Sequence, residues 1–98
     1  MIIAQVRFPR SEPISLEDVT EIFRSTAPKY KGRQGLQKKM YTRSEDGMTV
    51  GALYFWESRA DAEATYTDDW RAMVTDKYGA APVITFFDAP VIVDNLEK

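Results

Sequence analysis

The clearest local signal for the fold lies in the stretch of residues 36–56: Leu36-Gln37-Lys38-Lys39-Met40-Tyr41-Thr42-Arg43-Ser44, Glu45-Asp46-Gly47 and Met48-Thr49-Val50-Gly51-Ala52-Leu53-Tyr54-Phe55-Trp56. Its middle part is typical of a hairpin turn, because a glycine such as Gly47 takes a positive φ without steric cost. The parts on either side have the length of strands. The stretch therefore predicts two antiparallel strands, over residues 36–44 and 48–56.

Before this hairpin the sequence predicts one strand and one helix. Residues Ile2–Phe8 are rich in β-branched and aromatic residues and precede Pro9, as expected of a strand. Ser15 suits the N-cap of a helix. The apolar stripe of that helix is Leu16, Val19, Ile22 and Phe23. The pair Ala27-Pro28 predicts the end of the helix, and a basic loop over residues 29–35 follows.

After the hairpin the sequence predicts a second helix and another strand. Ser58 is the expected N-cap, and a second start signal at Thr67 predicts a helix that is bent or in two parts. Gly79 suits the position just past its end. Residues Val83–Asp88 are the predicted fourth strand, and Val91–Val93 forms either a short fifth strand or an extended tail.

The predicted order, β-α-β-β-α-β, is that of the ferredoxin-like α+β sandwich. In this fold class both helices cover one face of a four-stranded antiparallel sheet. The chain has 98 residues, so we expect one domain over residues 1–98.

The second face of the sheet is too apolar to be left in water. On the strand over residues 48–56, Tyr54 and Trp56 point to one side, and Leu53 and Phe55 point to the other. Two helices cover only one of these sides, and each large side chain left exposed forgoes about 1.5–3 kcal/mol. Because an exposed apolar patch usually marks a partner, we expect a homodimer in which sheet packs on sheet.

Composition excludes several classes of function. The formal net charge is −2, so the broad cationic surface of a nucleic-acid-binding protein is absent. Cysteine and histidine are both missing, which removes thiolate nucleophiles, histidine bases and ordinary zinc sites. No stretch approaches the roughly 18 apolar residues of a membrane span, and Met1–Phe8 lacks the features of a signal peptide. We therefore expect a cytoplasmic protein, in which a metal site built from carboxylates alone remains possible.

The sequence resembles the YdhR-like mono-oxygenases of the dimeric α+β barrel superfamily. The resemblance runs nearly end to end, and its most telling stretches are Gly35–Tyr41, Ser44–Asp46, Val50–Trp56 and Ser58–Ala62. It implies a small homodimer with a cleft between helices and sheet, and relatives that oxidise aromatic polyketides without metal or flavin. Two family sites do not transfer to this chain. Haem-degrading members use an axial histidine, which the chain lacks. Polyketide oxygenases use an Asn, Trp and Tyr constellation in the cleft, whereas the one asparagine here, Asn95, lies in the tail.

Cofactor-free oxygenation needs an apolar pocket, a donor that stabilises an anion and a route for a proton. Trp56, Tyr54, Tyr41 and Arg7 are the candidate donors, and Asp88 is the candidate general base. The alternative interpretation makes the aromatic residues part of the core and gives Arg7 a salt bridge across the dimer.

Two further groups of residues have both a functional and a structural interpretation. The candidate pocket residues, which could equally be core, are Phe23, Trp70, Met73 and Val74. The basic residues around Tyr30 would either steer an acidic ligand or form a solvated surface; they are Lys29, Lys31, Arg33, Lys38 and Lys39.

These observations leave two functional hypotheses. The first is a cofactor-independent mono-oxygenase that oxidises a small aromatic or apolar substrate between helices and sheet. The second is a non-catalytic homodimer that binds a small ligand or has only a structural role.

Overall fold

The computed structural model describes residues 1–96. The elements in this range are β1 (Ile2–Pro9), α1 (Leu16–Thr26), the 3-10 helix η1 (Ala27–Tyr30), β2 (Leu36–Arg43), β3 (Thr49–Trp56), α2 (Arg59–Thr65), α3 (Asp68–Tyr78) and β4 (Val83–Asp88). The predicted order of strands and helices is confirmed, and the second predicted helix is in two parts, α2 and α3.

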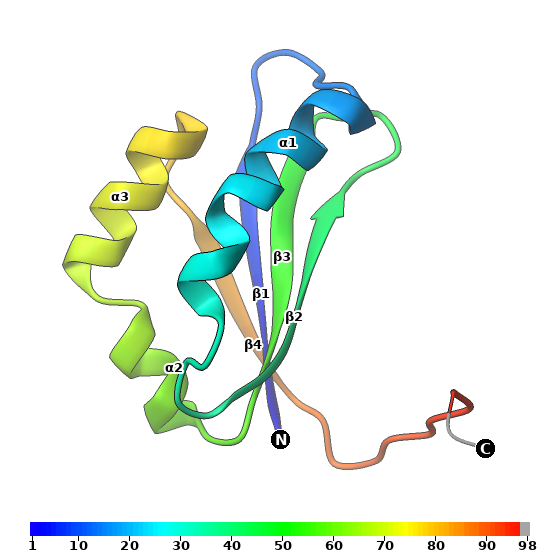
Figure 1. Cartoon of the computed structure of the whole chain (residues 1–98), viewed down its shortest axis with the longest axis vertical. Coiled ribbons are helices and arrows are strands. Elements are labelled where there is room, and N and C mark those ends of the chain that lie inside the picture. The colour runs from blue at the N-terminus through cyan, green and yellow to red at the C-terminus, as the bar shows by residue number, and fades with distance from the viewer. Residues whose placement is uncertain (97–98) are drawn as a thin grey trace.

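The four strands form one antiparallel sheet in the order β2-β3-β1-β4. All helices lie on one face of this sheet (Figure 1). The structure is thus the ferredoxin-like α+β fold that the sequence predicts. The inner face is the one that the helices cover, and the outer face is the opposite one.

The hairpin between β2 and β3 has the predicted turn, and Gly47 has a φ of 73°. Each strand is one residue shorter than expected on the turn side, because Ser44 belongs to the turn. Its hydroxyl donates to an Asp46 carboxylate oxygen at 2.7 Å and accepts from the Thr49 N–H at 3.0 Å.

Helices α1, α2 and α3 each follow a residue whose side chain caps the N-terminus of the helix. Ser15, Ser58 and Thr67 each accept a hydrogen bond from the backbone N–H three residues later, which satisfies a donor that has no partner within the helix. At the other end of α3, Gly79 adopts a left-handed conformation, as its position after the helix predicts.

The segment after α1 differs from the prediction of a loop that begins at Lys29. Helix α1 ends at Thr26 as expected, but the chain continues as η1 up to Tyr30. Pro28 is compatible with this turn, because proline in the first turn of a helix gives up an N–H that would have no partner there. As a result Tyr30 is buried under the helices instead of exposed in a loop.

The core fills the space between the inner face and the helices. Its residues alternate along β1 and β3; they include Ala4, Val6, Phe8, Val50, Ala52, Tyr54 and Trp56, each at most 4% exposed. Gly51 is required where β3 pairs with β1, because a Cβ there would collide with the backbone carbonyl oxygen of Val6.

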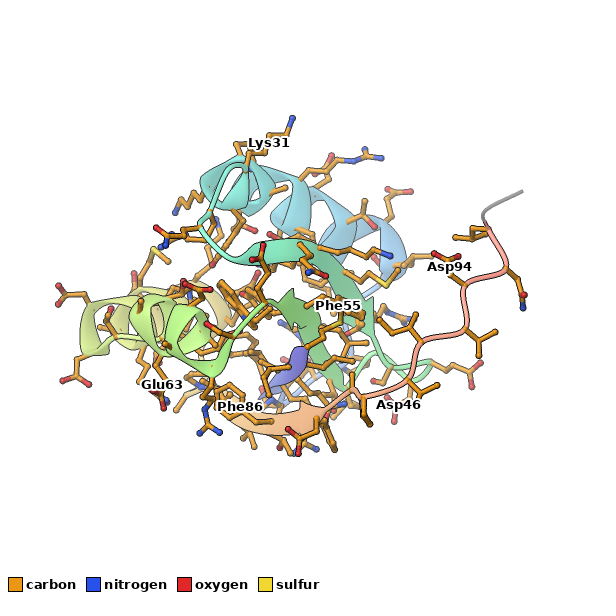
Figure 2. All side chains as sticks on the ribbon, turned by 90° about the horizontal axis from the view of Figure 1, so that it is seen from below. Lys31, Asp46, Phe55, Glu63, Phe86 and Asp94 are labelled. Atoms are coloured by element: carbon orange, nitrogen blue, oxygen red, sulfur yellow. The ribbon has the colours of Figure 1, made fainter. Side chains whose placement is uncertain are left out.

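The outer face carries apolar side chains that nothing within residues 1–96 covers fully. Leu53 and Phe55 are half-buried, whereas Met40 and Phe87 are 48% and 49% exposed. After β4 the chain forms the extended tail, with no strand in its described part, residues 89–96. Figure 2 shows Phe55 and the tail at Asp94 on the side of the sheet that faces away from α2 and α3.

Candidate functional site

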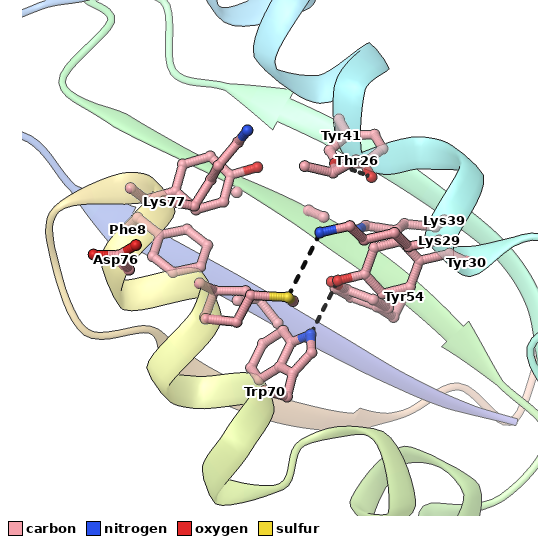
Figure 3. Close-up of a pocket in the computed structure, with 16 residues that line it drawn as sticks. Phe8, Thr26, Lys29, Tyr30, Lys39, Tyr41, Tyr54, Trp70, Asp76 and Lys77 are labelled. Carbon is pink, nitrogen blue, oxygen red and sulfur yellow. Dashed lines mark hydrogen bonds between the residues drawn. The ribbon is translucent and has the colours of Figure 1, made fainter.

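A cavity of about 160 Å³ lies between the inner face and the helices. Its walls come from β1, β2, β3, the α1–η1 junction and α3 (Figure 3), and most of them are aromatic or aliphatic. An engineered apolar cavity of about 150 Å³ holds a benzene molecule. The cavity therefore has the size of one aromatic ring.

The periodicities of strand and helix direct the cavity side chains inward. Lys39 and Tyr41 are two residues apart on β2 and share the inner face. Trp70, Met73 and Val74 have the i, i+3, i+4 spacing of one helix face on α3, and all three line the cavity.

Hydrogen bonds hold the aromatic walls in place. The Trp70 indole N–H donates to the Tyr30 hydroxyl at 2.9 Å, which joins α3 to η1. The Thr26 hydroxyl lies 2.7 Å from the Tyr41 hydroxyl and donates to the Phe23 carbonyl oxygen at 3.0 Å. Since Thr26 has one hydroxyl proton, Tyr41 is the donor in the bond between the two side chains.

Three tyrosines of the cavity, Tyr41, Tyr54 and Tyr78, are neutral near pH 7. Burial raises the pKa of Tyr54 far above its usual range, and burial also raises the pKa of Tyr41. Burial raises the pKa of Tyr78 to about 12. These walls therefore offer hydroxyl groups but no negative charge.

Lys39 places an amine among these rings. Its Nζ lies 3.4 Å from the ring centroid of Tyr30, 4.1 Å from that of Tyr41 and 4.5 Å from that of Tyr54. Within residues 1–96 the salt bridge present joins Arg59 and Glu63 on α2, so no carboxylate in this range forms one with Lys39. We call Lys39 and the three tyrosines the lysine cage.

Burial and the rings act on the Lys39 amine in opposite directions. Burial lowers the pKa of Lys39 from 10.5 to about 7, because the ammonium loses water. Cation–π attraction to the rings favours the ammonium by about 0.5–2 kcal/mol, which raises a pKa by about one unit. The effect of burial is larger, so the pKa of this amine lies well below the ordinary lysine value and part of the amine is neutral near physiological pH.

Other charged groups lie at the edges of the cavity. The Lys29 ammonium donates to the Met73 sulfur at 3.6 Å. Asp76 and Lys77 lie beside Phe8, on the opposite side of the cavity from Lys39 (Figure 3). No group of three or more carboxylates suited to a metal ion occurs within residues 1–96.

The structure brings most of the predicted pocket residues together. Tyr41 and Tyr54 line the cavity with the three α3 residues Trp70, Met73 and Val74. Phe23 lies behind this wall and stacks on Tyr41, with 4.7 Å between ring centroids.

Three of the predicted catalytic residues lie away from the cavity. Trp56 is fully buried in the core, and its indole N–H donates to the Tyr66 hydroxyl at 3.1 Å. Arg7 alternates with the buried Val6 and Phe8 and is exposed on the outer face, so the sheet separates it from the cavity. Asp88 is exposed at the end of β4.

Sequence reasoning missed Lys39 and Tyr30 as cavity residues. The basic segment is not one solvated surface: Lys39 lies in the lysine cage, whereas Lys31, Arg33 and Lys38 are exposed. Strand alternation contains the signal that would have identified Lys39, because it lies two residues before Tyr41 and so shares its face.

Similarity to solved structures appears at the level of the fold. The chain superposes on the Streptomyces coelicolor monooxygenase from ActVA-Orf6, solved with nanaomycin D. The TM-score is 0.70 over 96% of this chain and 92% of that one, at 19% identity. The chain has the fold of the antibiotic biosynthesis monooxygenases. SnoaB of Streptomyces nogalater, described as a cofactor-independent oxygenase, gives a TM-score of 0.66 at 15% identity, with 94% of this chain and 95% of that one covered.

A candidate antibiotic biosynthesis monooxygenase from Caulobacter crescentus has the same fold and 25% identity to this chain. Its TM-score is 0.61, with 90% of this chain and 89% of that chain covered. No protein-family sequence model matches the chain, and no curated protein matches it by sequence. The described residues contain no helix long and apolar enough to cross a membrane.

Proposed function

We propose that this protein is a cofactor-independent mono-oxygenase that oxidises a small aromatic substrate in the cavity between sheet and helices. The observation that carries the proposal is a ring-sized aromatic cavity with one amine inside a fold that antibiotic biosynthesis monooxygenases share. We also propose that the protein belongs with the YdhR-like mono-oxygenases, which its sequence resembles, and that it is cytoplasmic, as expected for a chain in which we see no signal peptide.

The chemistry requires little from the protein, because the substrate supplies the electrons. Phenol and O₂, for example, give benzoquinone and water: one oxygen atom enters the ring and the other leaves as water. A deprotonated phenol or enol is the species that reduces O₂. The protein would hold the ring in an apolar cavity, stabilise its anion and remove its proton.

Oxygen uptake tests this function directly. We expect the protein to consume O₂ with some members of a panel of single-ring phenols and hydroquinones, and to transfer one atom of ¹⁸O₂ into the product. A panel that extends to three-ring phenols would show whether the cavity limits the substrate to one ring. Absence of turnover throughout the panel would overturn the proposal.

The second candidate function is a non-catalytic ligand-binding module. The hydrogen bonds Trp70–Tyr30 and Thr26–Tyr41 favour it, because they engage wall groups with each other and leave fewer free for a substrate. This alternative predicts that phenols bind in the cavity and that no oxygen is consumed.

We also propose that the protein acts as a homodimer formed through the outer face. Leu53 and Phe55 at its centre are only half-buried, and Met40 and Phe87 flank them. The tail, which lies on the same side of the sheet at Asp94 (Figure 2), adds Val91 and Val93, each 81% exposed. A second copy packed on this surface would remove all these side chains from water.

A further inference from the structure

We propose that Lys39 is the catalytic base of this site: its neutral amine accepts the hydroxyl proton of a bound phenol, and the resulting ammonium holds the phenolate. The inference rests on the proposed function, and it narrows the substrate to a single-ring phenol or enol whose hydroxyl group reaches the lysine cage.

The position of the amine supports this role. Lys39 lines the cavity, and its Nζ lies within 4.5 Å of three ring centroids. These rings come from β2, β3 and η1, so three separate elements fix the end of a flexible side chain. The amine can therefore touch a ring bound in the cavity.

Charge balance within the cavity points to an acidic ligand. The walls next to Lys39 are tyrosine rings, of which burial keeps Tyr41 and Tyr54 neutral, and no carboxylate within residues 1–96 forms a salt bridge with the amine. Without an anion beside it, burial favours the neutral amine, and an anion bound next to it would stabilise the ammonium. A phenol suits this place, because it gives its proton to the neutral amine and becomes that anion.

The proton transfer is balanced and needs no further reactant. The phenol O–H bond breaks, an N–H bond forms at Lys39 Nζ, and the electron pair stays on the phenolate oxygen. The phenolate is then the reductant, and O₂ is the oxidant of the proposed mono-oxygenation. Burial, which lowers the pKa of Lys39 to about 7, keeps neutral amine available to start this step.

The other ionisable groups of the cavity do not replace Lys39. Asp76 and Lys77 on α3 lie on the opposite side of the cavity, and the Lys29 ammonium on η1 is engaged with the Met73 sulfur. The remaining ionisable side chains that line the cavity are Tyr30, Tyr41, Tyr54 and Tyr78, on η1, β2, β3 and α3. Of all these groups, Lys39 alone is an amine enclosed by the rings.

Binding of 4-nitrophenol tests the inference without any turnover, because its phenol and phenolate forms differ in colour. We expect the wild-type protein to bind it as phenolate and to lower its titration midpoint by about one pH unit or more. Lys39→Met should bind it as the neutral phenol, and Lys31→Met, which alters an exposed lysine outside the cavity, should behave as wild type. Absence of 4-nitrophenol binding to the wild-type protein, or an unchanged midpoint, overturns the inference.

The variants Lys39→Met and Lys39→Arg distinguish the role of Lys39 as a base from the effect of its positive charge. Lys39→Arg keeps a cation but does not accept a proton at neutral pH, so it should still bind 4-nitrophenolate while oxygen uptake with phenols at pH 7 falls about 100-fold. Uptake that is unchanged in both Lys39→Met and Lys39→Arg overturns the inference and leaves the proposed function intact. Ionisation of 4-nitrophenol without any oxygen uptake retains the inference about Lys39 as an acceptor and overturns the proposed oxygenase.

A measurement on the wild-type protein tests the inference even if the Lys39 variants do not fold. The Nζ of ¹⁵N-labelled Lys39 should titrate near pH 7 by NMR, and 4-nitrophenol should raise that midpoint because phenolate stabilises the ammonium. A midpoint at the ordinary lysine value of about 10.4 overturns the inference.

Discussion

Two adjacent lysines on β2 have opposite environments because strand alternation sends them to opposite faces of the sheet. Lys38 is exposed on the outer face, with its Nζ 5.5 Å from the ring centroid of Phe55. Lys39 lies on the inner face and enters the lysine cage. Comparison of Lys39 with Lys38 therefore tests the effect of burial on the pKa of a lysine amine.

We predict that Lys39 makes the stability of the protein rise with pH between pH 7 and 9. The folded-state pKa of about 7 lies below the ordinary value of 10.5, so the unfolded chain binds more protons in this window. The free energy of unfolding of the wild-type protein should therefore increase by about 1–2 kcal/mol, given at most about 1.4 kcal/mol per pH unit. The raised tyrosine pKa values keep those side chains from titrating in the same window.

Urea denaturation at pH 7, 8 and 9 checks this prediction. Lys39→Met should abolish the part of the rise that comes from the buried amine, whereas Lys38→Met should retain it. Equal pH dependence in all three proteins would contradict it.

A second residue-level prediction concerns Trp56. It is fully buried outside the cavity, so Trp56→Phe should remove packing and the hydrogen bond to Tyr66 and cost about 1–3 kcal/mol of unfolding free energy. Binding of 4-nitrophenol should be unchanged. Urea denaturation and a binding titration measure the two effects, and loss of binding in the folded variant would show that Trp56 belongs to the site.

The aromatic residues of the cavity walls could be predicted from the sequence, whereas the amine of Lys39 could not. Tyr41, Tyr54 and Trp70 were identifiable because large aromatic side chains on the core face of an element also border any cavity there. Lys39 belongs to a basic segment of the sequence, and charged side chains are mostly exposed to solvent. Its burial depends on three rings from distant parts of the chain, which no local pattern reveals.

At the level of elements, the predicted hairpin organises the site because β3 lies in the middle of the sheet and β2 carries the lysine. Turn and cap residues made these elements predictable: Gly47 marks the hairpin, and Ser58 and Thr67 mark the starts of α2 and α3. The helix η1 was not predicted, because one 3-10 turn is too short for a hydrophobic period. It nevertheless supplies Tyr30, one ring of the lysine cage.

The pairing of β3 with β1 predicts a strong effect of Gly51→Ala. The added methyl group would meet the backbone carbonyl oxygen of Val6, which cannot move without disturbing the sheet. We expect a loss of about 1–3 kcal/mol of unfolding free energy, measured by thermal or urea denaturation. Thr42→Ala, on the residue of β2 that pairs with Gly51, should change it by no more than about 0.5 kcal/mol. Equal effects of the two substitutions would contradict the steric argument.

The molecule as a whole has one helix-covered face and one apolar outer face, which leads to a prediction about assembly. The wild-type protein at micromolar concentration should sediment as a dimer. Leu53→Asp should yield monomers, because a carboxylate would be buried without a partner in the proposed interface. Glu63→Gln, on the exposed side of α2, should leave the assembly unchanged. Sedimentation of the wild-type protein as single chains would contradict the proposed dimer.

The two tryptophans differ in their access to the cavity. Both are buried and pack against Tyr66, but of the two only Trp70 lines the cavity, so a nitroaromatic bound there should quench it by direct contact. In Trp56→Phe the remaining emission comes from Trp70 alone. Each nitroaromatic molecule that enters the cavity would then quench the fluorescence of Trp70, so occupancy of the cavity could be followed in real time while the fold is intact.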